Sequence, residues 1–348
     1  MAETWSASRL HAEIAEQPEA VARFLAREGS RVARLAVPLR KAGIRFVLVA
    51  ARGTSDNAAR YAQYLFGALD GLPVALAAPS LTTLYGRPPD ARGGLVVGIS
   101  QSGRSPDIVE TVAAARRAGA PTLAIVNDAE SPLAHAAAEV IPLHAGEERS
   151  VAATKTYTVQ LAAVALLAIS FAGRKALLGQ LHAVPDAVAL ALGAEAAVRR
   201  MARRLAGTSR AVVLARGVNY PTAWEIALKL KELALILAEP YSSADFQHGP
   251  IALAERGLPA VLVSAPGGKP AGELLALARR VLGLRARGSP VLPVGLPVRG
   301  AIPLPAVPEL LSPLVAVVPG QLLAFHAALE RGLDPDAPRG LRKVTETR

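Results

Sequence analysis

Short apolar runs alternate with amphipathic segments along the first 145 residues. The apolar runs end just before Gly53 and at Ser100, and others lie within residues 73–80, 122–128 and 140–144. They are short, rich in Val, Ile and Ala, and apolar throughout, which is typical of strands buried on both faces of a parallel sheet. The segments that follow Gly53 and Ser105 have helical periodicity. This alternation predicts an α/β fold in which helices cover both faces of a parallel sheet.

Two further segments are predicted to be helical. Residues 8–36 show an interrupted apolar face with a break at Pro18. Residues 159–172 are almost entirely apolar, but they are shorter than the roughly 20 residues that a membrane span needs. We therefore expect a buried helix there, and a cytoplasmic protein that makes no membrane contact.

The second half of the chain repeats the pattern of the first. One shift of 164 residues aligns the run before Gly53 with the run before Gly217, and it also aligns Ser100 with Ser264 and Gly103 with Gly267. Two βα turns that match at one offset indicate a duplicated unit of roughly 160 residues. The first copy reads Ser-Gln-Ser-Gly and the second reads Ser-Ala-Pro-Gly, so the turn repeats but its polar groups do not.

The turn after Ser100 carries an unusual number of polar groups at a predicted helix start. These residues are Ser100, Gln101, Ser102 and Ser105, and they surround Gly103. The first N–H groups of a helix have no partner within the helix, and together with the helix dipole they favour a bound anion such as phosphate. A serine-capped βα turn with no ligand is the alternative interpretation of the same residues.

Composition narrows the possible functions. The chain has 348 residues, of which 51% are hydrophobic and 4% aromatic, so its core depends on aliphatic side chains. It has no cysteine, which excludes disulfides and thiolate metal sites. The net charge of +11 could attract nucleic acid, but the arginines are scattered, no aromatic platform lies among them and no nucleic-acid-binding motif occurs. We expect no nucleic-acid partner.

A second polar cluster is predicted on a helix that begins near Pro221. Residues Glu225, Lys229 and Glu232 are spaced by four and three, so they share one face of this helix. A solvated, salt-bridged surface is one interpretation. The surrounding residues are mostly apolar, however, which indicates a partly buried Glu232 suited to proton transfer. His248 follows in a Gly-Pro turn, whereas the other five histidines have no sequence neighbours that indicate a site and none forms a metal-binding pair.

Several motifs together resemble the sugar isomerase (SIS) family, and within it the isomerase half of the glucosamine-6-phosphate synthases. These motifs are RGTS, SQSGRS, EERSVAATKTYT, ALKLKELALILAEPYSSADFQHGPIAL and DAPRGLRKVT, and they occur in the family's order. The resemblance runs from about residue 10 to the end. It implies two tandem SIS domains, each a three-layer α/β/α unit, in a homodimer with active sites near the subunit interface. We expect a helical arm (1–36), two SIS domains (37–190 and 191–331) and an active-site tail (332–348).

The resemblance also implies a role for individual residues. It implies that the sugar phosphate is bound by Thr54, Ser100, Gln101, Ser102 and Ser105, and at the position of Ala153. Glu232 matches the carboxylate that moves a proton between C1 and C2. His248 matches the histidine that assists ring opening across the dimer, and Lys343 matches the lysine that forms a Schiff base with the open-chain ketose. No metal or organic cofactor is expected for this chemistry.

The chain also departs from the family pattern. No counterpart of the glutaminase domain or of its cysteine nucleophile is seen, so ammonia from glutamine is not expected. Ala153 stands where the synthases have serine, and Asp245 stands where glutamate is usual, which leaves the sugar open. The leading hypothesis is an isomerase/deaminase that converts glucosamine 6-phosphate to fructose 6-phosphate and ammonia. Plain aldose–ketose isomerisation, a fructosamine-6-phosphate deglycase and a non-catalytic phosphosugar-binding regulator are the alternatives.

Overall fold

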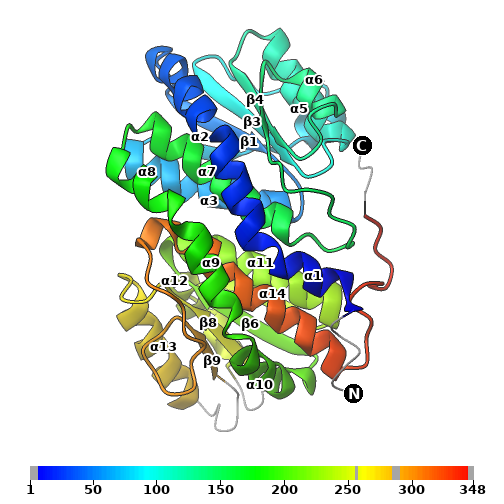
Figure 1. The fold of residues 1–348 in the computed structure, drawn as a ribbon, viewed down its shortest axis with the longest axis vertical. Helices are drawn as coiled ribbons and strands as arrows, with labels where there is room; N and C mark the ends of the chain where they lie inside the picture. The colour runs from blue at the N-terminus through cyan, green and yellow to red at the C-terminus, as the bar shows by residue number, and fades with distance from the viewer. Residues whose placement is uncertain (1–6, 255–257, 284–290, 344–348) are drawn as a thin grey trace. The chain divides into compact units, whose positions relative to one another are not determined.

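The computed structural model describes residues 7–254, 258–283 and 291–343, and it divides into two units. What we call the first unit comprises Glu19–Glu148, Lys155–His182 and Arg342–Arg348. The second unit comprises Met1–Pro18, Arg149–Thr154 and Ala183–Leu341. Each unit is built on one parallel sheet (Figure 1).

The first unit contains five strands and most of the N-terminal helices. Its strands are β1 (Phe46–Ala50), β2 (Val74–Leu76), β3 (Gly94–Ser100), β4 (Thr122–Val126) and β5 (Glu139–Pro142). Its helices are α2 (Gln17–Lys41, which begins in the second unit), α3 (Thr54–Asp70), α4 (Ser80–Thr83), α5 (Pro106–Arg117), α6 (Pro132–Ala136), α7 (Lys155–Phe171) and α8 (Lys175–His182). The helix break predicted at Pro18 is present two residues earlier: a separate short helix ends at Ala15, Glu16 is its C-cap, and Pro18 is the second residue of α2.

The first sheet has the strand order β2-β1-β3-β4-β5, and every neighbouring pair is parallel. Side chains alternate between its two faces. One face packs on α5 and α6 through a core that includes Val96, Val112 and Leu133, and α3 and α7 lie against each other on the opposite side (Figure 1). The prediction of a parallel sheet covered on both faces is thereby confirmed.

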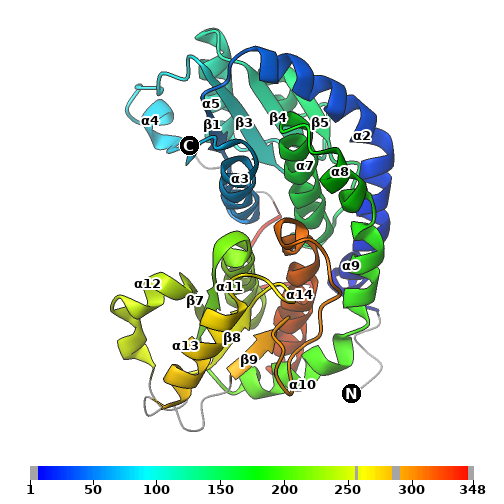
Figure 2. The ribbon, with the colours of Figure 1, turned by 90° about the vertical axis from the view of Figure 1, so that its left-hand side faces the viewer.

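The second unit contains four strands. They are β6 (Arg210–Ala215), β7 (Leu237–Ser242), β8 (Ala260–Val263) and β9 (Val291–Val294). Its α-helices are α1 (Arg9–Ala15), α9 (Val184–Leu192), α10 (Glu195–Ala206), α11 (Tyr220–Ala234), α12 (Ser243–Gln247), α13 (Ala271–Gly283) and α14 (Pro313–Glu330), with short 3₁₀ turns at Gly217–Asn219, Pro250–Leu253 and Glu309–Leu311. Figure 2 shows α12 and α13 on one side of this sheet and α11 and α14 on the other.

The second sheet repeats the first. Its order, β7-β6-β8-β9, corresponds to β2-β1-β3-β4, and all of its pairs are parallel. The 164-residue shift carries β1 onto β6, β3 onto β8 and α3 onto α11, each to within two residues at both ends. The aligned glycines of the βα turns also share a left-handed backbone, with φ of 54° and 61° for Gly53 and Gly217. The duplication that the sequence indicates is therefore present in the fold.

Two helices, α7 and α14, are apolar and buried along most of their length. Helix α7 is buried along nearly its whole length, which confirms the buried helix expected around residues 159–172. Helix α14 is the one single helix among the described residues that is long and apolar enough to cross a membrane, and 89% of that stretch is buried inside the protein. It packs against α10 and α11, as expected for a core helix.

Candidate active site

Two βα turns of the first unit open at the same edge of its sheet. Gly53 and Thr54 follow β1 at the start of α3, and residues 100–105 connect β3 to α5. Strands β1 and β3 are parallel neighbours with Ala50 opposite Gly98, so both turns leave from carboxyl ends that lie side by side. In open α/β sheets, ligands bind at this edge. The structure therefore brings together the two turns whose residues were expected to hold a sugar phosphate.

The turn after β3 is shaped by its own side chains and by one glycine. Ser100 Oγ accepts a hydrogen bond from the N–H of Gly103 at 3.0 Å, and Ser102 Oγ accepts one from the N–H of Arg104 at 3.3 Å. Gly103 has φ of 64°, and a Cβ at this position would lie 2.1 Å from Ser131 Oγ. Only glycine fits here, because any side chain would meet both a left-handed backbone and the buried Ser131.

The polar groups of this turn are accessible to a ligand. Gln101, Ser102 and Ser105 are partly exposed, whereas Ser100 is buried. Ser105 is the N-cap of α5, and in this described turn its side chain makes no capping hydrogen bond. Its hydroxyl is thus available beside the amino end of a helix, where an anion is favoured.

A cation joins the two turns. The guanidinium of Arg52, which lies between β1 and α3, contacts the carboxylate of Asp107 in the first turn of α5 at 2.7 Å. The side chain of Asp107 is 2% exposed and that of Arg52 is 51% exposed. About half of the Arg52 side chain therefore faces solvent at the mouth of the candidate anion site, where its charge raises the local positive potential.

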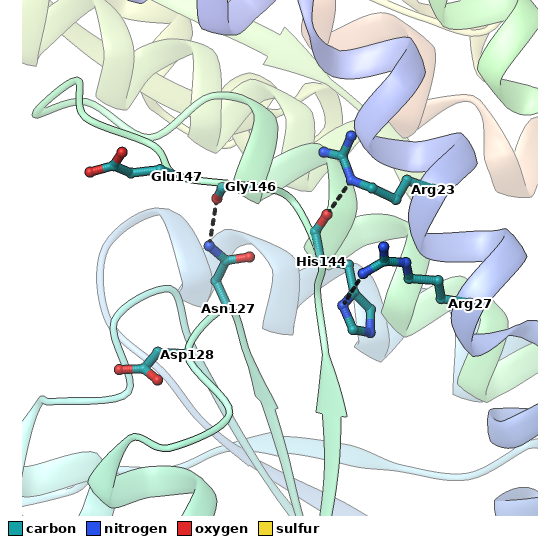
Figure 3. Close-up of a pocket in the computed structure, with 7 residues that line it drawn as sticks. All are labelled: Arg23, Arg27, Asn127, Asp128, His144, Gly146 and Glu147. Carbon is teal, nitrogen blue, oxygen red and sulfur yellow. Dashed lines mark hydrogen bonds between the residues drawn. The ribbon is translucent and has the colours of Figure 1, made fainter.

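A cavity of about 460 Å³ lies on the same sheet edge, beyond β4 and β5 (Figure 3). Its wall includes Arg23 and Arg27 from α2, and His144 from the segment after β5. Arg23 Nε donates to the carbonyl oxygen of His144 at 2.7 Å, and His144 Nε2 lies 2.8 Å from a carboxylate oxygen of Glu28. The sequence did not indicate Glu28 as a partner of His144, because the two residues are 116 positions apart in the chain.

Lys343 lies in the first unit, although it is the last residue described. Its Nζ contacts Glu148 Oε2 at 3.2 Å. The carboxylate of Glu148 is fully buried and also accepts hydrogen bonds from the backbone N–H and the hydroxyl of Thr156, at 3.1 and 2.6 Å. The family role of Lys343 was expected from its motif, but its carboxylate partner was not predicted.

The second unit carries the predicted polar face of α11. Lys229 Nζ lies 2.5 Å from Glu232 Oε2 and 3.5 Å from Glu225 Oε1. The side chains of Lys229 and Glu225 are 1% and 0% exposed, and that of Glu232 is 22% exposed. The alternative of a solvated salt-bridged surface is wrong for this helix, because its apolar surroundings bury two of the three charges. Glu232 is the member of the group that a substrate could reach.

His248 and Ala153 also lie in the second unit. His248 is the C-cap that follows α12 and is exposed. Ala153 is partly exposed in a segment that donates a hydrogen bond to Glu13 and accepts one from Gln321. No hydrogen bond or ion pair joins His248 to Glu232 in the described part of the chain.

A histidine cluster in the second unit was not predicted. His11 Nε2 and His326 Nε2 each lie 2.8 Å from the same oxygen of Glu195. Burial raises the pKa of Glu195, but the hydrogen bonds and charges of the two histidines outweigh it and lower the pKa to about 2. Glu195 and His326 also border a cavity of about 370 Å³ lined by Arg199, Arg200 and Arg203. Across the described residues, no cluster of three or more His, Asp or Glu side chains could hold a metal ion.

Comparison with known proteins identifies related sequences. The family model described as "SIS domain" matches residues 39–170 and 204–294. Glutamine–fructose-6-phosphate aminotransferase (isomerizing) of Gloeobacter violaceus is 38% identical over 313 residues, which cover 85% of this chain and 51% of that protein. The chain thus spans about half the length of the curated relatives that it matches.

Solved structures show the same architecture over nearly the whole chain. A Silicibacter pomeroyi DSS-3 protein assigned as a phosphosugar isomerase has a TM-score of 0.85 and 36% identity, and the match covers 94% of this chain and 100% of that one. The C-terminal domain of glucosamine–fructose-6-phosphate aminotransferase from Francisella tularensis also has a TM-score of 0.85, with 27% identity and coverage of 97% and 100%. The resemblance seen in the motifs is confirmed, including its restriction to the isomerase half.

Proposed function

The chain belongs to the SIS domain family, and from that premise we propose that it is a phosphosugar isomerase/deaminase acting on a hexosamine 6-phosphate. The substrate class is drawn from the relatives, whose names refer to fructose 6-phosphate and to phosphosugars. In the proposed reaction, glucosamine 6-phosphate and water give fructose 6-phosphate and ammonia. The homodimer and its shared active sites are part of the same proposal.

The observation that carries the proposal is the arrangement of Glu232. It is a partly exposed carboxylate at the edge of a buried charge group, and the ammonium of Lys229 holds one of its oxygens. A base of this kind is oriented before the substrate arrives, while its second oxygen is left to meet a C–H bond. Thr54, Ser100, Gln101, Ser102 and Ser105 would hold the phosphate at the helix starts of the first unit.

The chemistry follows from these roles. His248 would exchange the proton that opens the sugar ring and exposes the C1 aldehyde. Glu232 would then take the C2 proton and return it to C1, which converts the amino aldehyde into a C2 imine. Water adds to that imine and ammonia leaves, so that the ketose phosphate remains. Lys343 would form an imine with the open-chain ketose or stabilise negative charge on it.

The test is to measure ammonia and fructose 6-phosphate released from glucosamine 6-phosphate. We expect Glu232→Gln to lower turnover by about 10²–10⁴-fold with a small change in KM, as is usual for loss of a general base. Glu239→Gln is the matched control, since Glu239 lies in the same unit, is half exposed and has only a 4.0 Å ion pair with Lys231. Undiminished turnover in Glu232→Gln would contradict the assignment.

Two alternatives are separated by the same assay. Ketose formation without ammonia from an aldose phosphate would indicate plain isomerisation. Tight sugar-phosphate binding without turnover would indicate a non-catalytic binding protein, the alternative from another functional class. Sedimentation of the full chain tests the proposed dimer, and activity regained on mixing Glu232→Gln with His248→Ala would support a histidine supplied by the second copy.

A further inference from the structure

The partner of Lys343 offers an inference that goes beyond the motifs. Lys343 Nζ lies 3.2 Å from Glu148 Oε2, although the two residues are 195 positions apart in the chain. The side chain of Lys343 is 27% exposed, whereas that of Glu148 is 0% exposed. An amine at the edge of solvent therefore faces a carboxylate that has been withdrawn from water.

Glu148 is held in place by α7. The carboxylate accepts the backbone N–H of Thr156 through Oε1 at 3.1 Å and the Thr156 hydroxyl through Oε2 at 2.6 Å. Both bonds are buried and come from the first turn of α7, where the helix dipole also favours negative charge. Because both oxygens are engaged by a rigid element, the carboxylate presents a fixed acceptor to Lys343.

We propose that Glu148 is a positioning residue for Lys343: it anchors the lysine and accepts the proton that the amine loses before it attacks the sugar carbonyl. This inference rests on the proposed function, from which Lys343 takes its role as imine-forming group. The motifs assigned no role to Glu148. In the sequence it is one of several polar residues that precede the apolar helix α7.

The step balances with these two residues and the sugar alone. The ammonium of Lys343 transfers one proton to Glu148, and its freed electron pair forms a bond to the C2 carbonyl carbon of the open-chain ketose. The C=O π electrons move to oxygen, which takes the proton back from Glu148. A second Nζ proton reaches the new hydroxyl through Glu148, water leaves, and the product is a protonated imine on Lys343.

The first experiment needs no sugar. Acetic anhydride is applied to the full-length chain, and acylation of Lys343 is quantified by mass spectrometry against Lys175, an exposed lysine in the same unit. We expect Glu148→Gln to speed acylation of Lys343 about tenfold, because its amino group is no longer engaged in a hydrogen bond to a charged carboxylate. Glu147→Gln is the matched control, since it removes the same charge from the exposed neighbouring residue.

The second experiment traps the imine. Fructose 6-phosphate and borohydride are added, and the rate of adduct formation on Lys343 is followed as a function of pH. We expect Glu148→Gln to slow trapping about 100-fold at neutral pH, with less than a threefold change in the sugar concentration that gives half the maximal rate. Glu148→Asp should recover part of the rate, because the shorter carboxylate can still accept a proton, and Glu147→Gln should behave as the native chain does.

The outcomes separate the two proposals. Equal acylation of Lys343 in the native chain and in Glu148→Gln, or equal trapping rates, would overturn the role of Glu148. If acylation differs as expected but the native chain traps no hexose phosphate, the proposed function fails and the proton-transfer step fails with it, while the anchoring of Lys343 stands. Thermal unfolding of both variants shows whether a lost rate reflects a lost fold.

Discussion

The turns after β3 and β8 have the same backbone but different surroundings. Gly103 and Gly267 occupy aligned positions with φ of 64° and 66°. A Cβ on Gly103 would collide with Ser131, whereas a Cβ on Gly267 would meet nothing within 4 Å. Ser100 Oγ accepts the N–H of Gly103, whereas Ser264 Oγ donates to the carbonyl oxygen of Ala265. The duplicated architecture thus requires the turn, while its close packing and its polar groups belong to the first copy alone.

The aligned arginines repeat this contrast. Arg52 and Arg216 each contact a carboxylate in the first turn of the helix after the neighbouring strand, α5 or α13, at 2.7 Å in both units. The carboxylate of Asp107 is 2% exposed, whereas that of Glu273 is 35% exposed. The ion pair links two βα turns in both units, but only in the first unit is its carboxylate buried. This difference supports a ligand site in the first unit and a structural role for its counterpart.

The largest effect is expected from substituting the aligned glycines. Gly103→Ala should destabilise the protein by about 3–5 kcal/mol, because it combines a strained left-handed backbone with a collision against a buried serine. Gly267→Ala should cost only about 1–2 kcal/mol, since it strains the left-handed backbone but its Cβ collides with nothing. Urea unfolding of the two variants measures the difference. Equal losses of stability would show that the two turns are packed alike.

A smaller effect is expected on ligand affinity from the aligned serines. Ser100→Ala and Ser105→Ala should each weaken binding of fructose 6-phosphate about tenfold, which corresponds to loss of one hydrogen bond to a charged group. Ser264→Ala should leave the affinity unchanged. Titration calorimetry measures all three variants. An effect of Ser264→Ala as large as that of Ser100→Ala would contradict a phosphate site confined to the first unit.

The smallest effect is expected from the arginines. Arg52→Gln should cost about 1 kcal/mol of stability, because it leaves the buried Asp107 without its cation, although the Arg52 side chain is itself half exposed to water. Arg216→Gln should cost about 0.5 kcal/mol or less, as for other exposed ion pairs. Thermal unfolding at low and high salt compares them, and the Arg216 effect should be the one that salt removes. If high salt removed the effect of Arg52→Gln but not that of Arg216→Gln, this expectation would be wrong.

Local pattern was sufficient to predict most of the fold. The strands that end before Gly53 and at Ser100, the helix near Pro221 and the 164-residue repeat are all present. Burial on both faces of a sheet requires a short, wholly apolar run, and burial of one helix face imposes a helical period on neighbouring residues. The polar face formed by Glu225, Lys229 and Glu232 was predicted for the same reason. The strands and helices among these features depend on residues within one or two turns of each other, whereas the repeat was seen by matching two turns at an offset of 164 residues.

The tertiary structure alone decided which distant charges meet. The pairs His144–Glu28, His11–Glu195 and Lys343–Glu148 join residues that are 116, 184 and 195 positions apart, so no periodicity marks them. They form because the sheets and their helices bring remote segments together, and an imidazole, an amine or a carboxylate taken out of water must then find a partner. The sequence by itself determined where strands, turns and helices lie, whereas the burial of Glu148 beside Lys343 depends on packing that only the folded chain creates.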